Sequence, residues 1–178
     1  QNGQDAPWNV KYWGIGNEAW GCGGNMEPEF YADLCRQYAT YMRSYDNSHK
    51  IYKIASGANV ADYNWTKVVM EKAGRLIDAV SLHYYTVPRS GSWADKGPAT
   101  GFTREEYFST LRKTLFMEEL VENHSRIIRQ YQGGRQVGLC VDEWGTWFDV
   151  EPGTNPGFLY QQNTMRDALV AAINLNIF

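Results

Sequence analysis

Two glutamates that follow apolar, strand-like runs are the residues of this chain best suited to catalysis. Glu18 ends the run 12–17, and Glu143 ends the run 137–142. A carboxyl group at the end of a buried strand costs free energy unless it is paired or has a function. Two such groups brought to one place, one as acid/base and one as nucleophile, are what the retaining hydrolysis of a glycosidic bond needs.

Alternating strands and helices must position these carboxyl groups. The hydrophobic pattern predicts strands over residues 10–15, 51–55, 78–83 and 136–141. It predicts helices from about residue 28, over 65–73, from 103 to 131 with breaks, and over 160–175. Thr103 and Glu106 form a candidate capping box. On the first helix one apolar face holds Phe30, Leu34, Tyr38, Tyr41 and Tyr45, and on the last helix Met165, Leu169, Val170 and Ile173 point inward.

Four strand–helix units predict an α/β fold with a parallel sheet covered by helices. A doubly wound sheet and a (β/α)8 barrel both satisfy this pattern. The candidate chemistry follows three strands, at 17–18, 83–85 and 142–144. In a barrel these strand ends converge on one pocket, whereas an open sheet would spread them along an edge. The chain contains no GxGxxG or phosphate-loop motif, so we expect the barrel.

Composition excludes several classes of protein. The chain has 178 residues, a net charge of −3 and mixed charge signs, so no basic face is expected for nucleic acid. No apolar run approaches the roughly 20 residues of a membrane span. Three cysteines and three histidines lack metal-ligand spacing, so neither a metal nor a cofactor is predicted. Aromatic residues make up 15%, which suits either core packing or stacking on sugar rings.

Four segments carry a family resemblance. Residues 11–18, 81–86, 141–147 and 151–157 resemble glycoside hydrolase family 51, which consists mainly of α-L-arabinofuranosidases. The resemblance covers nearly the whole chain, in order and at family-like spacing. It implies a partial (β/α)8 TIM barrel, in which residues 1–178 supply approximately strands 4 to 7 with their helices. The N-terminal strands and the C-terminal β-sandwich of the family are expected to be absent from this stretch.

The resemblance also implies roles for four residues. Glu18 matches the acid/base and Glu143 the nucleophile. Tyr85 matches a tyrosine that hydrogen-bonds near the nucleophile, with the adjacent Tyr84 as the alternative, and His83 is expected beside it. The alternative for the two glutamates is a structural ion pair, and for His83 a buried core histidine.

The remaining candidates are substrate-binding residues. Asn17 suits a hydrogen bond to the 2-hydroxyl of the sugar. Trp20 and Trp144 are predicted to contact substrate, with core packing as the alternative. Asp142 should point to the opposite face of the strand from Glu143 and is interpreted as structural, paired with a base.

The function expected from the resemblance is the release of α-L-arabinofuranosyl residues from saccharides by double displacement. The expected partner is an arabinofuranosyl-containing saccharide, with no nucleic acid and no membrane, and a homo-oligomer of the full-length protein is left open. The alternatives are another retaining glycosidase of the same clan, such as a β-1,4-glucanase or xylosidase, and a non-catalytic carbohydrate-binding barrel. The sequence gives no compartment.

Overall fold

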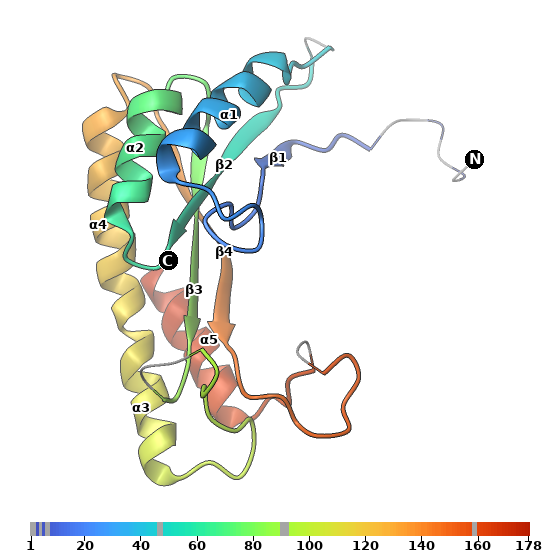
Figure 1. The fold of residues 1–178 in the computed structure, drawn as a ribbon, viewed down its shortest axis with the longest axis vertical. Helices are drawn as coiled ribbons and strands as arrows, with labels where there is room; N and C mark the ends of the chain where they lie inside the picture. Colours follow the sequence, from blue (N-terminus) through green and yellow to red (C-terminus); the bar gives the residue numbers. More distant parts are fainter. Residues whose placement is uncertain (1–2, 4, 6–7, 46–47, 90–92, 158–159) are drawn as a thin grey trace. The chain divides into compact units, whose positions relative to one another are not determined.

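Strands and helices alternate along the chain in the computed structural model, which describes residues 3, 5, 8–45, 48–89, 93–157 and 160–178 (Figure 1). In chain order the elements are β1 (Tyr12–Ile15), α1 (Pro28–Tyr41), β2 (Tyr52–Asn59), α2 (Tyr63–Ala73), β3 (Ala79–Thr86), α3 (Arg104–Thr114), α4 (Phe116–Tyr131), β4 (Gly138–Thr146) and α5 (Met165–Ile177).

The strands form a four-stranded sheet in the order β1-β2-β3-β4. β1 pairs with β2 in parallel, from Tyr12 opposite Tyr52 to Ile15 opposite Ala55. The predicted α/β class and its four strand–helix units are confirmed. The strands end later than predicted, since β3 continues to Thr86 and β4 to Thr146. Candidate residues predicted to follow these two strands therefore lie inside them.

The chain divides into two compact units. Unit 1 comprises Gln1–Leu82 and Asn123–Val141, and unit 2 comprises His83–Glu122 and Asp142–Phe178. Three elements, β3, α4 and β4, begin in one unit and end in the other. Each unit is described by itself below.

In unit 1, a tyrosine hydroxyl joins α1 to the strands. The Tyr31 hydroxyl donates to the carbonyl of Ile15 at 2.6 Å and accepts from the amide of Ser56 at 2.6 Å. Trp65 of α2 stacks on Tyr31, with ring centroids 5.4 Å apart, and its indole donates to the Ser56 carbonyl at 3.0 Å. Burial raises the pKa of Tyr31, so the hydroxyl stays protonated and keeps its donor. These bonds fix the position of α1 relative to the ends of β1 and β2.

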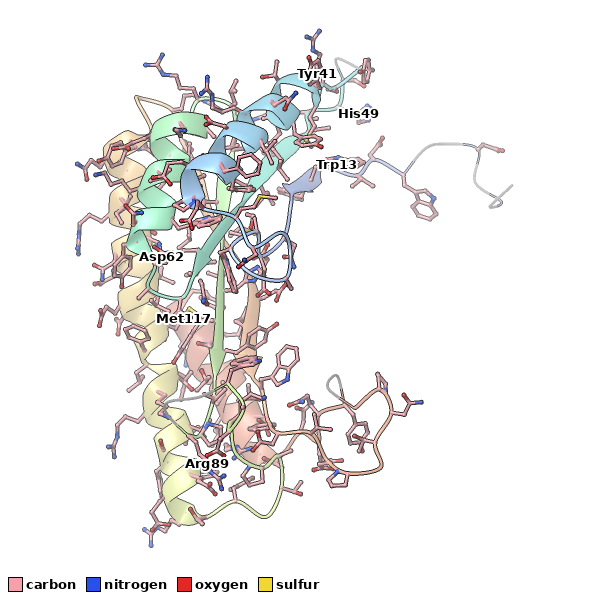
Figure 2. All side chains as sticks on the ribbon, viewed as in Figure 1. Trp13, Tyr41, His49, Asp62, Arg89 and Met117 are labelled. Atoms are coloured by element: carbon pink, nitrogen blue, oxygen red, sulfur yellow. The ribbon has the colours of Figure 1, made fainter. Side chains whose placement is uncertain are left out.

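The packed face of α1 is not the predicted one. The buried residues of this helix are Tyr31, Ala32, Cys35 and Ala39. The predicted apolar face is mostly exposed: Phe30 and Tyr38 are 58% and 61% exposed, Leu34 is half-buried, and Tyr45 lies beyond the helix end. Tyr41, which is labelled in Figure 2, is 70% exposed. Large aromatics dominated the pattern, but small side chains let the helix approach the sheet closely. α1 therefore has two apolar faces, and the described residues cover one of them.

In unit 2, α3 begins with the predicted capping box. Thr103 accepts from the amide of Glu106, and the Glu106 side chain accepts from the amide of Thr103, so this prediction is confirmed. The predicted break before Tyr131 is also present, because α3 ends at Thr114 and α4 begins at Phe116. Neither helix, nor any other in the described residues, is long and apolar enough to cross a membrane.

Helix α5 packs on α3, and of its three buried residues the pattern selected one, Val170. It buries Arg166, Val170 and Asn174, whereas Met165 is 71% exposed and Leu169 is 37% exposed. The Arg166 guanidinium lies between two phenylalanine rings, 3.8 Å from the centroid of Phe102 and 4.2 Å from that of Phe148. It also donates to the carbonyl of Ala99 at 3.2 Å. A cation held between aromatic faces is thus buried on this helix together with the predicted Val170.

Candidate active site

In unit 2, the carboxyl group of Glu143 is held by two side chains from the neighbouring strand. The Tyr85 hydroxyl donates to Glu143 Oε2 at 3.0 Å, and His83 Nδ1 lies 3.5 Å from the same oxygen. His83 and Tyr85 are two residues apart on β3, so both point to the same face of the sheet. The Glu143 side chain is 33% exposed and therefore remains open to a ligand. This arrangement holds one oxygen of a carboxylate in a fixed orientation while the group stays accessible.

His83 also faces a second carboxylate. Its Nε2 lies 3.2 Å from Asp142 Oδ1, while the imidazole itself is only 6% exposed. Asp142 was predicted to be structural and paired with a base, and this contact with His83 provides such a base.

Three aromatic rings lie together in unit 2. The Tyr85 ring meets that of Trp147 edge-on, with centroids 4.9 Å apart. Trp93 lies 5.8 Å from Trp147 and 6.4 Å from Tyr85, and it is 58% exposed. We call these three residues the aromatic wall. Through Tyr85, the wall is directly connected to Glu143 and presents exposed ring surface beside it.

Tyr84 and Trp144 lie away from this group. The Tyr84 hydroxyl donates to the carbonyl of Lys113 at 2.7 Å, and its ring meets Phe116 edge-on. Burial raises the pKa of Tyr84. The ring of Trp144 packs against Phe178, 5.3 Å away. Of the two adjacent tyrosines, Tyr85 is therefore the one that contacts Glu143. Trp144 packs against the end of α5, and its contact with substrate stays a prediction.

In unit 1, Glu18 lies in a tight turn after β1. Its backbone has a φ of 42°, in the left-handed region that few residues other than glycine adopt. Its carbonyl accepts from the amides of Gly21 at 2.8 Å and Gly23 at 3.0 Å. A Cβ on Gly23 would lie 1.6 Å from the carbonyl oxygen of Asn17, so no other residue fits there without rearrangement. The glycine-rich sequence after Glu18 is thus required by the geometry of the turn.

The next residues anchor this turn to β2. The amide of Ala19 donates to Ser56 Oγ at 3.2 Å, and the Trp20 indole donates to the carbonyl of Gly57 at 3.1 Å. The Cys22 thiol donates to Glu18 Oε2 at 3.1 Å. Trp20, predicted to bind substrate, is half-buried and packs against the core of unit 1, while Asn17 is exposed. Backbone strain at Glu18, held by this many contacts, is typical of a functional residue.

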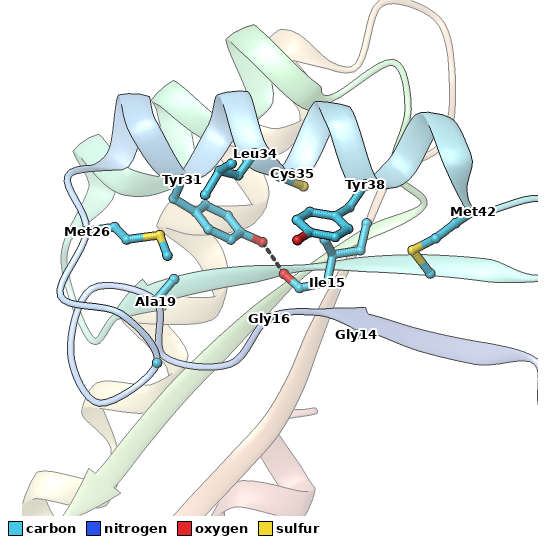
Figure 3. Close-up of a pocket in the computed structure, with 11 residues that line it drawn as sticks. Gly14, Ile15, Gly16, Ala19, Met26, Tyr31, Leu34, Cys35, Tyr38 and Met42 are labelled. Carbon is cyan, nitrogen blue, oxygen red and sulfur yellow. Dashed lines mark hydrogen bonds between the residues drawn. The ribbon is translucent and has the colours of Figure 1, made fainter.

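Unit 1 also contains an apolar hollow. It has a volume of about 300 Å³ and lies between β1 and α1, lined by Gly14, Ile15, Gly16, Ala19, Gly23, Met26, Tyr31, Leu34, Cys35, Tyr38 and Met42 (Figure 3). Its lining contains no carboxylate, and burial raises the pKa of the Cys35 thiol, which keeps it protonated. The hollow therefore lacks the groups for hydrolysis and is not the candidate active site.

Sequence reasoning did not select two residues whose rings lie next to Tyr85, the hydrogen-bond partner of Glu143. Trp147 follows Glu143 by four residues, inside a segment that carried the family resemblance, and this position is a usable signal. Trp93 lies in the irregular segment between β3 and α3. No periodic pattern marks a loop residue, so only the fold reveals it.

Comparison with known proteins shows similarity to one group of enzymes. The family model described as the alpha-L-arabinofuranosidase C-terminal domain matches residues 142–178. An intracellular exo-alpha-L-arabinofuranosidase of Bacteroides ovatus is 51% identical over all 178 residues, which span 34% of that protein. A probable alpha-L-arabinofuranosidase C of Aspergillus clavatus is 28% identical over the whole chain, which spans 35% of it.

Solved structures show the same similarity. The GH51 arabinofuranosidase of Xanthomonas axonopodis pv. citri matches with a TM-score of 0.92 and 51% identity, covering 99% of this chain and 35% of that one. The arabinose complex of the Thermotoga maritima alpha-L-arabinofuranosidase matches with a TM-score of 0.74 and 29% identity, covering 97% and 32%. The chain thus spans about a third of the length of the relatives it matches.

Proposed function

We propose, on the premise that this chain belongs to glycoside hydrolase family 51, that it carries both catalytic glutamates of a retaining α-L-arabinofuranosidase. One observation carries the proposal: the contacts of Tyr85 and His83 with a single oxygen of Glu143. A carboxylate that only closed an ion pair would not need a hydroxyl and an imidazole on one oxygen. These contacts hold Oε2 and leave Oε1 to be directed at a substrate.

In the first proposed step, Glu143 is the nucleophile. Its carboxylate attacks the anomeric carbon of an arabinofuranosyl unit and forms a covalent ester. The bond to the leaving oxygen breaks, and Glu18, as the acid, gives its proton to that oxygen. Tyr85 donates to the Glu143 carboxylate before attack and holds it in position.

In the second proposed step, Glu18 is the base. It takes a proton from water, whose oxygen attacks the anomeric carbon and breaks the ester to Glu143. The product has the configuration of the substrate, because the carbon is inverted twice. Asn17 is proposed to hydrogen-bond the sugar 2-hydroxyl, a contact that strengthens in the transition state. The aromatic wall is proposed as the surface against which the saccharide packs.

An assay of the full-length protein on aryl glycosides tests this function. We expect hydrolysis of aryl α-L-arabinofuranosides and no comparable hydrolysis of aryl β-xylosides or β-glucosides. Proton NMR of the first sugar released should show retained anomeric configuration. Preference for a β-xyloside or β-glucoside would favour another glycosidase of the clan, saccharide binding without hydrolysis would favour a carbohydrate-binding barrel, and an inverted product would rule out the covalent step.

We also propose that residues 1–178 supply four of the eight strands of a barrel. The exposed apolar side chains of β1 and α1 support this, because Tyr12 is 66% exposed and Phe30 58%. Such surfaces are normally covered. Expressed alone, residues 1–178 should aggregate or unfold without a sharp transition, and should be inactive. A soluble monomer with cooperative thermal unfolding and measurable hydrolysis would show that this stretch is a complete domain.

A further inference from the structure

The segment of unit 2 that carries Trp93 is closed at its base. The amide of Arg89 donates to the carbonyl of Lys96 at 3.2 Å, which joins two described parts of this segment. Gly97 follows with a φ of +99°, and a Cβ there would lie 3.3 Å from Pro88 Cβ. Only glycine combines this backbone conformation with so close an approach. Trp93 therefore lies three residues before a part of the chain, at Lys96 and Gly97, whose backbone is fixed.

The carboxyl group of Asp149 fastens the base of this loop. Its Oδ1 accepts from the amide of Lys96 at 2.9 Å, and its Oδ2 accepts from the amide of Gly97 at 3.0 Å. The amide of Asp149 donates in turn to the carbonyl of Gly97 at 2.9 Å. Three hydrogen bonds, two of them to a charged acceptor, thus join the segment after β4 to the segment after β3.

The side chain of Lys96 extends this contact to Trp93. Lys96 is only 8% exposed, and its Nζ donates to the carbonyl of Trp93 at 2.8 Å. The ammonium lies 5.0 Å from the centroid of the Trp93 ring and 4.0 Å from Asp149 Oδ1. A buried ammonium needs such partners, and here they are the indole ring, its carbonyl and the carboxylate.

We propose that Asp149 is a positioning residue that holds Trp93 against Trp147 and thereby sets the aromatic wall beside Glu143. Trp147 precedes Asp149 by two residues, so one end of the link is fixed by the chain itself. Trp93 is the other end, reached through Lys96. Only the consequence of this proposal, the binding of a saccharide on the aromatic wall, rests on the proposed function.

Loss of this link should weaken binding more than chemistry. Tyr85 and Glu143 contact each other from β3 and β4, and that bond does not pass through the loop. Trp93 would move relative to the other two rings when the link is lost. A group that binds the ground state and the transition state equally changes KM and leaves kcat unchanged. Asp149 should therefore act on KM.

The test compares three variants of the full-length protein on an aryl α-L-arabinofuranoside. Asp149→Ala should raise KM about tenfold and change kcat less than about twofold. Asp149→Asn keeps one acceptor oxygen and should recover part of the loss. Asp95→Ala is the matched control, since Asp95 lies on the same loop and pairs with the exposed Arg89 at 2.6 Å. This control should stay within about twofold of the parent protein in KM and kcat.

Backbone hydrogen exchange supplies a readout independent of activity. The amides of Lys96 and Gly97 should exchange at least about tenfold faster in Asp149→Ala than in the parent protein. Their exchange rates in Asp149→Asn should lie between those of these two proteins, and Asp95→Ala should leave the rates unchanged. Unchanged exchange in Asp149→Ala, or an equal KM change in the control, would overturn the proposal. If the parent protein hydrolyses no arabinofuranoside, the proposed function fails, and exchange at these two amides still decides whether Asp149 holds the loop.

Discussion

The turn that carries Glu18 and the strand that carries Glu143 hold a carboxyl group by different means. Around Glu18 the main chain is fixed, through a left-handed backbone conformation and two amides on its carbonyl, and one thiol, that of Cys22, donates to the carboxyl group. Around Glu143 the side chains of His83 and Tyr85 contact the carboxylate itself. A proton donor that becomes a base must let its carboxyl group respond to each step, whereas a nucleophile benefits from one fixed orientation. The difference therefore matches the two proposed roles.

Removing each carboxyl group gives the largest expected difference between the two regions. Glu143→Ala in the full-length protein should abolish turnover of every substrate, because no covalent ester forms. Glu18→Ala should lose roughly 10²- to 10⁴-fold on substrates whose leaving group needs a proton. It should still form the ester from aryl substrates with good leaving groups, and added azide should speed its second step. Equal responses of the two variants to azide and to leaving-group pKa would remove the distinction.

The main-chain control of Glu18 predicts a large effect from a glycine that touches no substrate. Gly23→Ala places a Cβ 1.6 Å from the Asn17 carbonyl oxygen, so the turn must rearrange. We expect a loss of about 3 kcal/mol in the free energy of unfolding, measured by chemical denaturation of the full-length protein.

Gly21→Ala is the matched control for this substitution. A Cβ at Gly21 would lie 3.9 Å from the Glu18 carbonyl oxygen, an ordinary contact, and should cost less than about 1 kcal/mol. Similar losses in the two variants would mean that the turn adapts and that the backbone does not fix Glu18.

The side-chain control of Glu143 predicts an effect on rate from one hydroxyl. Tyr85→Phe removes a hydrogen bond to a charged acceptor, which contributes roughly 1.5–3 kcal/mol, and should lower kcat roughly 10- to 100-fold. Tyr84→Phe removes a bond to the Lys113 carbonyl and should change stability by about 1 kcal/mol with kcat unaffected. A larger loss of kcat in Tyr84→Phe than in Tyr85→Phe would show that Tyr85 is not the hydrogen-bond partner of the proposed nucleophile.

Pattern and propensity predicted the elements better than their packed faces. Pro28 and the Thr103 capping box mark helix starts through local hydrogen bonding and steric effects, which act within one turn. The buried face of α1 depends on what lies across from it. Cys35 and Ala39 are buried because the strands approach closely there, and the larger Phe30 faces outward. Periodicity finds an apolar face but cannot tell which of two apolar faces the described residues cover.

The candidate site likewise contains some residues that the sequence indicated and others that only the fold reveals. Glu18 and Glu143 follow recognisable strand sequences, so their positions were readable from the chain. Trp93 and Asp149 act through loop geometry, where Lys96 and Gly97 supply backbone amides. Almost any residue supplies a backbone amide, so no residue type in the sequence predicts the hydrogen bonds of Asp149 to these amides. Arg166 is similar, because its burial depends on two phenylalanine rings that are distant in sequence.

The smallest expected effect concerns a buried histidine of unit 1 that holds the main chain. His124 is fully buried, with Nε2 2.7 Å from the carbonyl of Val60 and Nδ1 2.8 Å from Thr66 Oγ1. A carbonyl can only accept, so Nε2 carries the proton and Nδ1 accepts from the Thr66 hydroxyl. Val60 has a φ of 50°, a costly conformation for a β-branched residue, and this bond helps to hold it. The groups facing the imidazole also include Asp62 and the ring of Tyr63, 4.8 Å away.

Acid should therefore destabilise unit 1 through His124. Burial lowers the pKa of His124, an effect larger than the opposing ones of the Val60 carbonyl and Asp62. The unfolded chain then binds the proton more readily than the folded one, so the contribution to stability is complete above about pH 6.5, the ordinary pKa of histidine, and falls as the pH drops below it. His124→Gln keeps a neutral amide that can donate to Val60, and should flatten the dependence of Tm on pH over this range, whereas His49→Gln at an exposed site should leave it unchanged. Backbone hydrogen exchange at low pH should become faster first in the segment around Val60 and not around Glu143. If His124→Gln and the parent protein lose stability equally in acid, groups other than His124 cause that loss of stability.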